Sequence, residues 1–318
     1  MNEQFSSDRD LKEWIKCSQS LEYFAQNYWL GFDAFSKWQP KKLTPFKYQL
    51  DILKQFQENN NSLVVQTRQM HITSLTCLYI AWYALFNVDK VIYIISNNTE
   101  SAIRTLENIR IILQNCSFDK MFHWEDDFVK NNKTTIELKN RCRIKATGAA
   151  SNAGRGESIN FLYIDNAAFI KELDVIWMAT GMALSCFKNS KCIISSSPQK
   201  DSVFNLLGTN AAQSENDFKL IYAHWTKHPE YSKDIQKTDN EFQFTSPWYE
   251  KMKTMYGHDY RKICDELECV LDYTQQYPKD KTISLRLDME MHDKIQSKLK
   301  PGQTVSDYIR NLIAAAVN

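Results

Sequence analysis

Short apolar runs without alternation punctuate the chain, and longer segments between them place apolar residues three or four positions apart. The short runs predict buried strands over residues 63–66, 91–96, 161–164 and 192–196. The helical spacing between them predicts helices over residues 73–86, 100–114 and 172–185. Buried strands that alternate with helices are typical of a mostly parallel sheet with helices on both faces. The sequence therefore predicts an α/β fold.

Other segments of the first 273 residues add elements around this sheet. Amphipathic spacing predicts helices over residues 11–17, 21–30 and 46–59. Alternating polar and apolar residues predict a hairpin of residues 134–138 and 142–147, turned at 139–141, and a further strand over residues 219–223. Residues 226–247 are polar, which favours irregular structure. Residues 247–273 return to a helical pattern.

Residues 281–318 have a different pattern and form a candidate separate module. Polar and apolar residues alternate over 282–288, and a helical segment then ends at Pro301 and Gly302. The hydroxyls of Thr304 and Ser306 can cap a second helix. One strand and two helices of this length cannot bury a core alone, so the module is expected to pair with a second copy.

Composition restricts the classes of partner and the compartment. The 318 residues are 43% apolar, and a net charge of +1 gives no overall basic field, so any contact with DNA must be local. The apolar runs are shorter than the roughly 18–20 residues that span a bilayer, and the polar N-terminus does not resemble a signal peptide. The eight cysteines are scattered without a CxxC pair, which favours reduced thiols in a cytoplasmic compartment over disulfides or a structural zinc site.

Polar residues that follow the predicted strands are candidates for a nucleotide site. The first buried strand leads through a turn into a helix, which is the layout of a phosphate-binding loop. Asp165 ends an apolar strand, where a carboxylate can hold a Mg²⁺-bound water. Hydroxyls at 195–197 are suited to contact a phosphate, Arg155 lies on a glycine-rich loop, and Gln49 could hydrogen-bond an adenine edge.

As a linked set, these segments resemble the ATPase motifs of the large terminase subunits of tailed phages, the DNA-packaging motors. The family's P-loop carries Ser/Thr-Arg-Gln before Gly-Lys-Thr, and residues 67–74 have that frame. Residues 161–170 are similar to its acidic strand, Tyr-Ile-Asp-Glu followed by small residues and Phe-Ile. Residues 193–199 are similar to its hydroxyl triplet before proline. The resemblance covers residues 10–273 and implies a P-loop NTPase-like fold.

The resemblance also implies which side chains would contact a nucleotide, namely Gln49, Arg68, Gln69, Thr73, Ser74, Arg155, Asp165 and Ser197. Thr73 and Asp165 would hold Mg²⁺, provided that nucleotide binds. The chain departs from the family where the lysine is Ile72, the preceding glycine is His71 and the catalytic glutamate is Asn166. Isoleucine cannot neutralise phosphate charge, and asparagine cannot accept a proton from water. These departures favour a pseudo-ATPase with weak affinity, if any, for ATP and Mg²⁺.

Residues 281–317 resemble the ribbon-helix-helix family of DNA-binding domains, in which two chains pair their strands and place the ribbon in the major groove. The resemblance implies base contacts from Thr282, Ser284 and Arg286. It implies phosphate contacts near Thr304 and Ser306, at the start of the second helix. It also implies a homodimer formed through residues 281–318 and binding to double-stranded DNA.

Together the patterns divide the chain into four regions: an N-terminal helical part (1–60), the ATPase-like core (61–273), a linker (274–280) and the DNA-binding module (281–318). Large terminases also carry a nuclease domain. The segment between Tyr273 and the final module is too short to contain one, so DNA cleavage by that mechanism is not expected.

Three functions remain open from the sequence. The favoured hypothesis is a non-catalytic DNA-binding protein of phage or mobile-element origin. It would act in the bacterial cytoplasm and modulate packaging through a terminase, a portal or a small terminase subunit. The second is a packaging ATPase that hydrolyses ATP through an altered site and lacks the nuclease. The third is a transcriptional repressor in which the ATPase-like part is a platform.

Overall fold

The computed structural model describes residues 2–31, 41–116, 118, 122–239, 242–271, 295–296 and 298. The chain divides into two compact units, residues 1–273 and 274–318. Nearly all described residues belong to the first unit. The predicted DNA-contacting residues of the second unit lie outside the described residues: Thr282, Ser284, Arg286, Thr304 and Ser306.

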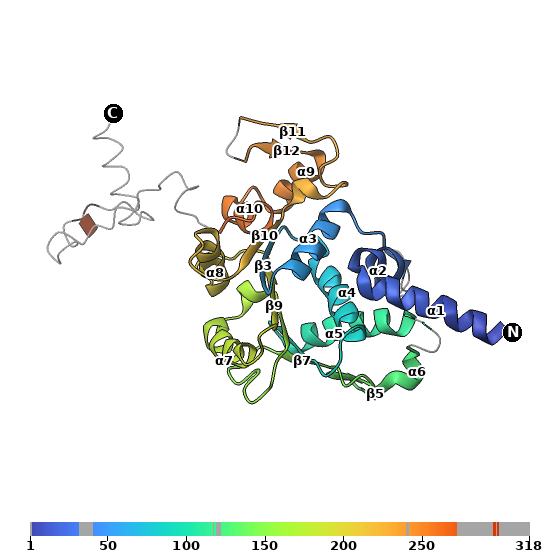
Figure 1. Ribbon diagram of the computed structural model, residues 1–318. Helices are drawn as coiled ribbons and strands as arrows, with labels where there is room; N and C mark the ends of the chain where they lie inside the picture. Colours follow the sequence, from blue (N-terminus) through green and yellow to red (C-terminus); the bar gives the residue numbers. More distant parts are fainter. Residues whose placement is uncertain are drawn as a thin grey trace. The chain divides into compact units, whose positions relative to one another are not determined.

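An eight-stranded sheet forms the centre of the first unit (Figure 1). Its strands are β3 (Asn61–Gln66), β4 (Val91–Ser96), β5 (Phe128–Asn131), β6 (Thr135–Leu138), β7 (Arg143–Gly148), β8 (Phe161–Asp165), β9 (Lys191–Ser196) and β10 (Lys219–Ala223). Their spatial order is β10-β3-β9-β8-β4-β7-β6-β5. Pairing is parallel from β10 to β7 and antiparallel at β6 and β5. The predicted α/β fold with a mostly parallel sheet is confirmed.

Helices pack on both faces of this sheet (Figure 1). One face is covered by α1 (Asn2–Gln19), α2 (Leu21–Tyr28), α3 (Lys47–Glu58), α4 (Ile72–Leu85) and α5 (Thr99–Asn115). The other face is covered by α7 (Leu173–Ser185) and α8 (Val203–Ala212). The remaining helical segments are α6 (Trp124–Asp127), η1 (Ala167–Phe169), η2 (Trp225–Lys227), α9 (Pro247–Met255) and α10 (Tyr260–Glu266). Two short strand pairs lie outside the main sheet, β1 (Leu30–Gly31) with β2 (Lys41–Lys42) and β11 (Gln236–Lys237) with β12 (Phe244–Thr245).

The central strands are buried on both faces, which explains why their residues do not alternate in polarity. Successive side chains of a strand point to opposite faces. Val64 and Ile94 accordingly join the core beneath α4 and α5, whereas Leu63, Val65 and Ile95 join the core beneath α7 and α8. All five side chains have no exposed area. An apolar residue is therefore favoured at every position of such a strand.

Most predicted elements are present, and the differences have local causes. The hairpin of β6 and β7 is confirmed, and the parallel strand β10 is confirmed. The sequence pattern does not indicate β5, a short strand with an irregular register against β6, or α8, which Ser202 caps by accepting the N–H of Asn205. The helix predicted over residues 247–273 is wrong in part. It breaks between α9 and α10, where Gly257 has a φ of 64°, and residues 267–271 are not helical.

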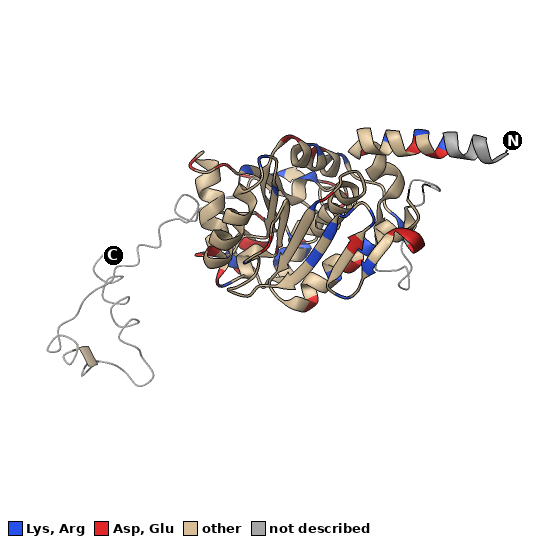
Figure 2. Cartoon of the chain, turned by 60° about the horizontal axis from the view of Figure 1, so that its bottom comes forward, with Lys and Arg blue, Asp and Glu red and all other residues tan. Residues whose placement is uncertain are grey.

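Opposite charges are interleaved on the antiparallel end of the sheet. Arg143 pairs with Glu137 at 3.2 Å, and Lys145 pairs with Glu157 at 2.7 Å. Figure 2 shows basic and acidic residues interspersed over this side of the unit. The basic residues here are therefore largely neutralised by their neighbours. No helix in the described part of the chain is long and apolar enough to cross a membrane.

Candidate nucleotide site

A cavity of about 780 Å³ lies at the carboxyl edge of the sheet, where the predicted site residues follow their strands. Ligands of open α/β sheets bind at this edge because the loops that leave the parallel strands meet there. The cavity is lined by Gln66, Arg68, Gln69, Met70, His71, Ile72, Thr73, Ser74, Asn97, Ser101, Asn108, Asn166, Phe169, Ser197 and Tyr231. Most of the predicted nucleotide-contacting residues are thus brought together.

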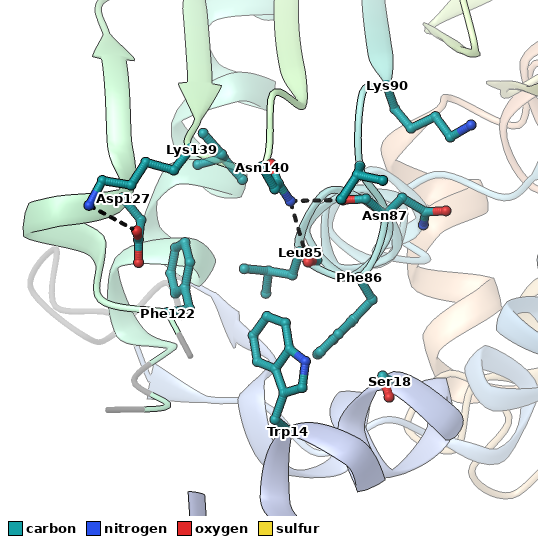
Figure 3. A pocket seen from close by; sticks show the side chains of 12 residues that line it. Trp14, Ser18, Leu85, Phe86, Asn87, Lys90, Phe122, Asp127, Lys139 and Asn140 are labelled. Atoms are coloured by element: carbon teal, nitrogen blue, oxygen red, sulfur yellow. Dashed lines mark hydrogen bonds and ion pairs between the residues drawn. The ribbon is translucent and has the colours of Figure 1, made fainter. Parts of the chain in front are cut away.

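A second cavity, of about 560 Å³, lies at the opposite, amino edge of the sheet. Figure 3 shows Trp14 and Phe86 on one side of it and Lys139, which pairs with Asp127, on the other. The side-chain amide of Asn140 donates to the carbonyls of Ala84 and Asn87 and closes the end of α4. This cavity contains none of the predicted site residues, and the polar groups beside it serve to join elements of the fold.

Hydrogen bonds from distant parts of the chain hold the loop between β3 and α4. The N–H of Arg68 donates to the carbonyl of Glu266, and the hydroxyl of Thr67 donates to the carbonyl of Leu267 at 2.7 Å. Two tyrosine hydroxyls hold the loop from its other side. Tyr48 donates to the carbonyl of Met70 at 3.0 Å, and Tyr231 donates to the carbonyl of Gln69 at 3.2 Å. The loop is therefore fixed by this chain's own side chains.

The start of α4 explains what the two departures from the P-loop pattern do. His71 has a φ of 57°, a left-handed conformation in which glycine is favoured. Its side chain does not cap the helix, so the first N–H groups of α4 lack a side-chain acceptor. Ile72 is only 1% exposed and packs in the core. The position at which the family carries its lysine is therefore part of the hydrophobic core.

Asp165 lies in a dense network of hydroxyl donors below the cavity. Its Oδ1 accepts hydrogen bonds from Thr73 at 3.1 Å, Tyr163 at 2.9 Å and Ser195 at 3.2 Å. Its Oδ2 accepts from the amide of Asn166 at 3.3 Å. Burial raises the pKa of the Asp165 carboxyl, although these hydrogen bonds act in the opposite direction. Thr73 and Asp165, the two residues predicted to hold Mg²⁺, thus lie in hydrogen-bond contact.

Asn166 and the hydroxyl run after β9 form the next part of the edge. Asn166 has a φ of 55° and begins the 3₁₀ turn η1, so its side chain reaches both the cavity and Asp165. Ser196 accepts the N–H of Ala168 at 3.2 Å, which ties β9 to that turn. Ser197 lines the cavity. The hydroxyl of Ser195 thus contacts Asp165, that of Ser196 contacts the N–H of Ala168, and Ser197 faces the cavity.

Arg68 is the one permanently charged side chain among the described residues that line the cavity. Its Nη1 lies 3.4 Å from Glu266 Oε1, so its charge is partly neutralised. Burial raises the pKa of Glu266, and the neighbouring Arg68 lowers it. Burial also lowers the pKa of His71, and the adjacent His228 has a pKa lowered to about 4. Both imidazoles are therefore neutral at pH 7, and the cavity has little positive charge.

Two predicted residues lie elsewhere in the described structure. Gln49 is 2% exposed, and its side-chain oxygen accepts the N–H of Phe46 at 2.9 Å to cap α3. Gln49 is not among the described residues that line the cavity. Arg155 is exposed on the turn that begins shortly after β7, and it does not line the cavity either. Their predicted contacts with a nucleotide stay predictions.

The residues predicted to hold Mg²⁺ have suitable chemistry, since hydroxyl and carboxylate oxygens are the ligands that this ion prefers. Thr73 and Asp165 lie within hydrogen-bond distance of each other. Within the described ranges, no cluster of three or more His, Cys, Asp or Glu side chains could hold a metal by itself. Magnesium would therefore need the phosphate oxygens of a nucleotide as further ligands, as the sequence comparison implied.

Sequence reasoning misses several residues that the fold adds to the site. Asn97 directly follows β4, and the rule that identified Asp165 at the end of β8 would have found it. Ser101 and Asn108 are seven positions apart on α5, so they share one face of that helix. Tyr231 comes from a segment more than 150 residues away from the loop it contacts. No local signal in the sequence predicts that contact.

Comparison with known proteins agrees with this geometry. The family model described as "Terminase large subunit, T4likevirus-type, N-terminal" matches residues 69–270, more than half of the chain. The HK97 bacteriophage large terminase is similar in structure, with a TM-score of 0.58 at 12% identity, over 79% of this chain and 54% of that chain. The ATPase domain of the Thermus phage P74-26 large terminase has a TM-score of 0.50 at 15% identity, over 72% and 94%.

A large terminase from a thermophilic bacteriophage, solved in complex with ATP-gamma-S, has a TM-score of 0.50 at 12% identity, over 71% of this chain and 53% of that chain. This chain thus spans about half the length of that protein and of the HK97 terminase. At such identities the structural likeness establishes the fold, and the family match establishes the relationship. The chain belongs to the terminase large subunit family.

Proposed function

We propose that this protein is a catalytically inactive large-terminase ATPase domain that binds DNA through its C-terminal module and modulates DNA packaging. The observation that carries the proposal is the buried side chain of Ile72 at the family's lysine position. An apolar residue in the core supplies no charge to the β- and γ-phosphates of ATP. Among the described residues that line the cavity, Arg68 is the one permanently charged cation, and it is already paired with Glu266.

The loss of a base supports the same proposal independently. Asn166 lies where the family has its catalytic glutamate, and an amide cannot accept a proton from an attacking water. Removal of a positioned base typically costs about 10²–10⁴-fold in rate. Asp165 cannot substitute for it, because three hydroxyls and the Asn166 amide already donate to its carboxyl oxygens. Two separate requirements of hydrolysis are therefore missing from one site.

DNA binding and dimerisation are assigned to residues 281–318 on the sequence pattern of that module. Thr282, Ser284 and Arg286 occupy alternate positions of the predicted strand, and an arginine next to hydroxyl residues suits base contacts in the major groove. The neutralised charges on the antiparallel end of the sheet make that surface a poor alternative for DNA (Figure 2). A DNA-bound dimer that retains the motor's fold could occupy a surface of a portal, a small terminase subunit or another terminase.

One observation favours a second function, hydrolysis of ATP through an altered site. The contact between Thr73 and Asp165 is retained, and so is a cavity large enough for a nucleotide. A Mg²⁺-dependent ATPase assay on the full chain and on Asp165→Ala separates the two proposals. Equal background phosphate release from both proteins is expected. Activity in the wild-type chain that is lost in Asp165→Ala would overturn the first proposal and establish the second.

A further inference from the structure

The cavity at the carboxyl edge is poor in charge but rich in neutral hydrogen-bonding groups. Five of the side chains that line it are amides: Gln66, Gln69, Asn97, Asn108 and Asn166. An amide offers both donors and acceptors without charge, which suits sugar hydroxyls and base edges. The wall composition therefore favours a polar ligand of low charge over a triphosphate.

Three of these amides have no hydrogen-bond partner for their side chains within the described structure: Gln66, Gln69 and Asn108. The other two are engaged. The Asn97 oxygen accepts from the Ser96 hydroxyl at 3.4 Å, and the Asn166 amide donates to Asp165. Gln66 at the end of β3 and Asn108 on α5 come from different elements and line one cavity. They are available to a ligand that can both donate and accept hydrogen bonds.

The charges near the cavity oppose a polyphosphate. Glu266 lies beside Arg68 at 3.4 Å and offsets its charge, and the Asp165 carboxyl lies below the floor. A triphosphate would therefore meet one guanidinium, already paired with Glu266, to balance its charge. Each phosphate group removed from the ligand reduces the charge that is left unbalanced.

Two ring surfaces complete the wall. Phe169, which is 42% exposed, lines the cavity beside Asn166. His71 also lines it, at the start of α4. Flat apolar or aromatic surfaces next to amides are what a nucleobase requires, because its faces stack and its edges hydrogen-bond. The cavity volume of about 780 Å³ falls within the range of small-molecule sites.

We infer that this cavity binds a nucleoside that carries at most one phosphate, in place of the triphosphate that a P-loop ATPase binds. The inference rests on the proposed loss of ATP hydrolysis and adds the class of ligand. The nucleoside's hydroxyls and base edge would satisfy Gln66, Gln69 and Asn108. A nucleoside without β- and γ-phosphates needs no lysine at position 72, so Ile72 can remain in the core.

Isothermal titration calorimetry of the full chain tests the inference with adenosine, guanosine, AMP and Mg²⁺-ATP as ligands. Adenosine or guanosine is expected to bind at least about tenfold more tightly than Mg²⁺-ATP, which is the reverse of the order for an ATPase. Asn108→Ala should weaken nucleoside binding about threefold to tenfold, the effect of one lost hydrogen bond. Asn115→Ala is the matched control, because Asn115 is exposed on the same helix and does not line the cavity.

Two results would overturn the inference: Mg²⁺-ATP that binds as tightly as adenosine, guanosine and AMP, or no binding of any of these three. Equal losses from Asn108→Ala and Asn115→Ala would also contradict the site assignment. Mg²⁺-ATP that binds tightly without hydrolysis would refute the ligand class and leave the proposed inactivity standing. Hydrolysis that requires Asp165 would refute both.

Discussion

At the residue scale, the candidate site departs from the family's motifs at His71, Ile72 and Asn166. His71 retains the left-handed conformation in which glycine is favoured. Ile72 joins the core instead of neutralising phosphate. Asn166 keeps a hydrogen bond to Asp165 while losing the capacity to act as a base. The linked motifs assign Thr73 and Asp165 to one Mg²⁺ ion, and the two side chains lie 3.1 Å apart. The sequence does not predict that Ile72 is buried, because the position of a residue at the start of a helix does not determine whether its side chain faces the core or the cavity.

The buried carboxyl of Asp165 predicts a specific dependence of stability on pH. Its pKa is raised above the ordinary value of 3.8, so the folded protein holds this proton more tightly than the unfolded chain. The free energy of unfolding gained from this tighter proton binding is then fully present below pH 3.8, and it is lost as the pH rises through the pKa of the folded state. The wild-type chain should therefore gain free energy of unfolding relative to Asp165→Asn as the pH is lowered from neutral toward 3.8.

Urea unfolding of both proteins at several pH values between 7 and about 4 measures this change. Asp234→Asn, on an exposed loop, is the control for removal of a carboxylate that is not buried. A difference between wild type and Asp165→Asn that does not vary with pH would show that burial does not control this carboxyl.

At the element scale, the loop between β3 and α4 is held by side chains that enter from other elements. Tyr48 comes from α3, and Tyr231 comes from the segment after η2. Strand and helix positions around the loop follow from the apolar pattern. The hydroxyl contacts do not, because a tyrosine gives the same helical signal whether its hydroxyl is bonded or free. The misjudged helix after Glu266 has a similar cause, since its backbone instead bonds to Thr67 and Arg68.

Tyr48→Phe should destabilise the protein and loosen the loop. The change leaves the buried carbonyl of Met70 without a donor, which typically costs about 1–3 kcal/mol of unfolding free energy. Urea unfolding measures that cost, and hydrogen exchange should show faster exchange of the amides at 68–72. Tyr222→Phe is the matched control, because Tyr222 is 39% exposed on β10, and it should change stability by less than about 0.5 kcal/mol. Equal effects of the two changes would refute the role given to the Tyr48 hydroxyl.

At the scale of the whole molecule, the sequence separates two units with different periodicities, and the chain also divides near Tyr273. The fold of the first unit could be predicted because its strands are buried on both faces and its helices are strongly periodic. The cavity wall could be predicted only in part, since its residues converge from β3, α4, β4, α5, η1 and the segment around Tyr231. Such convergence depends on long-range topology, which no single stretch of sequence specifies.

Removal of residues 274–318 should abolish dimerisation and DNA binding while the first unit stays folded. The first unit has its own two-sided core, so its thermal unfolding should persist. Light scattering after size-exclusion chromatography measures the mass, and DNA binding is measured at two salt concentrations because phosphate contacts are salt-dependent. Arg286→Ala should keep the dimer and weaken DNA binding. A truncated chain that still dimerises or binds DNA as the full chain does would contradict the assignment.

In the proposed function, the altered residues of the loop and the acidic strand prevent hydrolysis, and the fold does not. The steady-state rate of Mg²⁺-ATP hydrolysis tests this for the wild-type chain and for the triple variant His71→Gly, Ile72→Lys, Asn166→Glu, each with and without Asp165→Ala. The wild type should stay at background. The triple variant should exceed it by about 10²-fold or more, and Asp165→Ala should remove that gain. Hydrolysis by the wild-type chain that depends on Asp165 would contradict the claim.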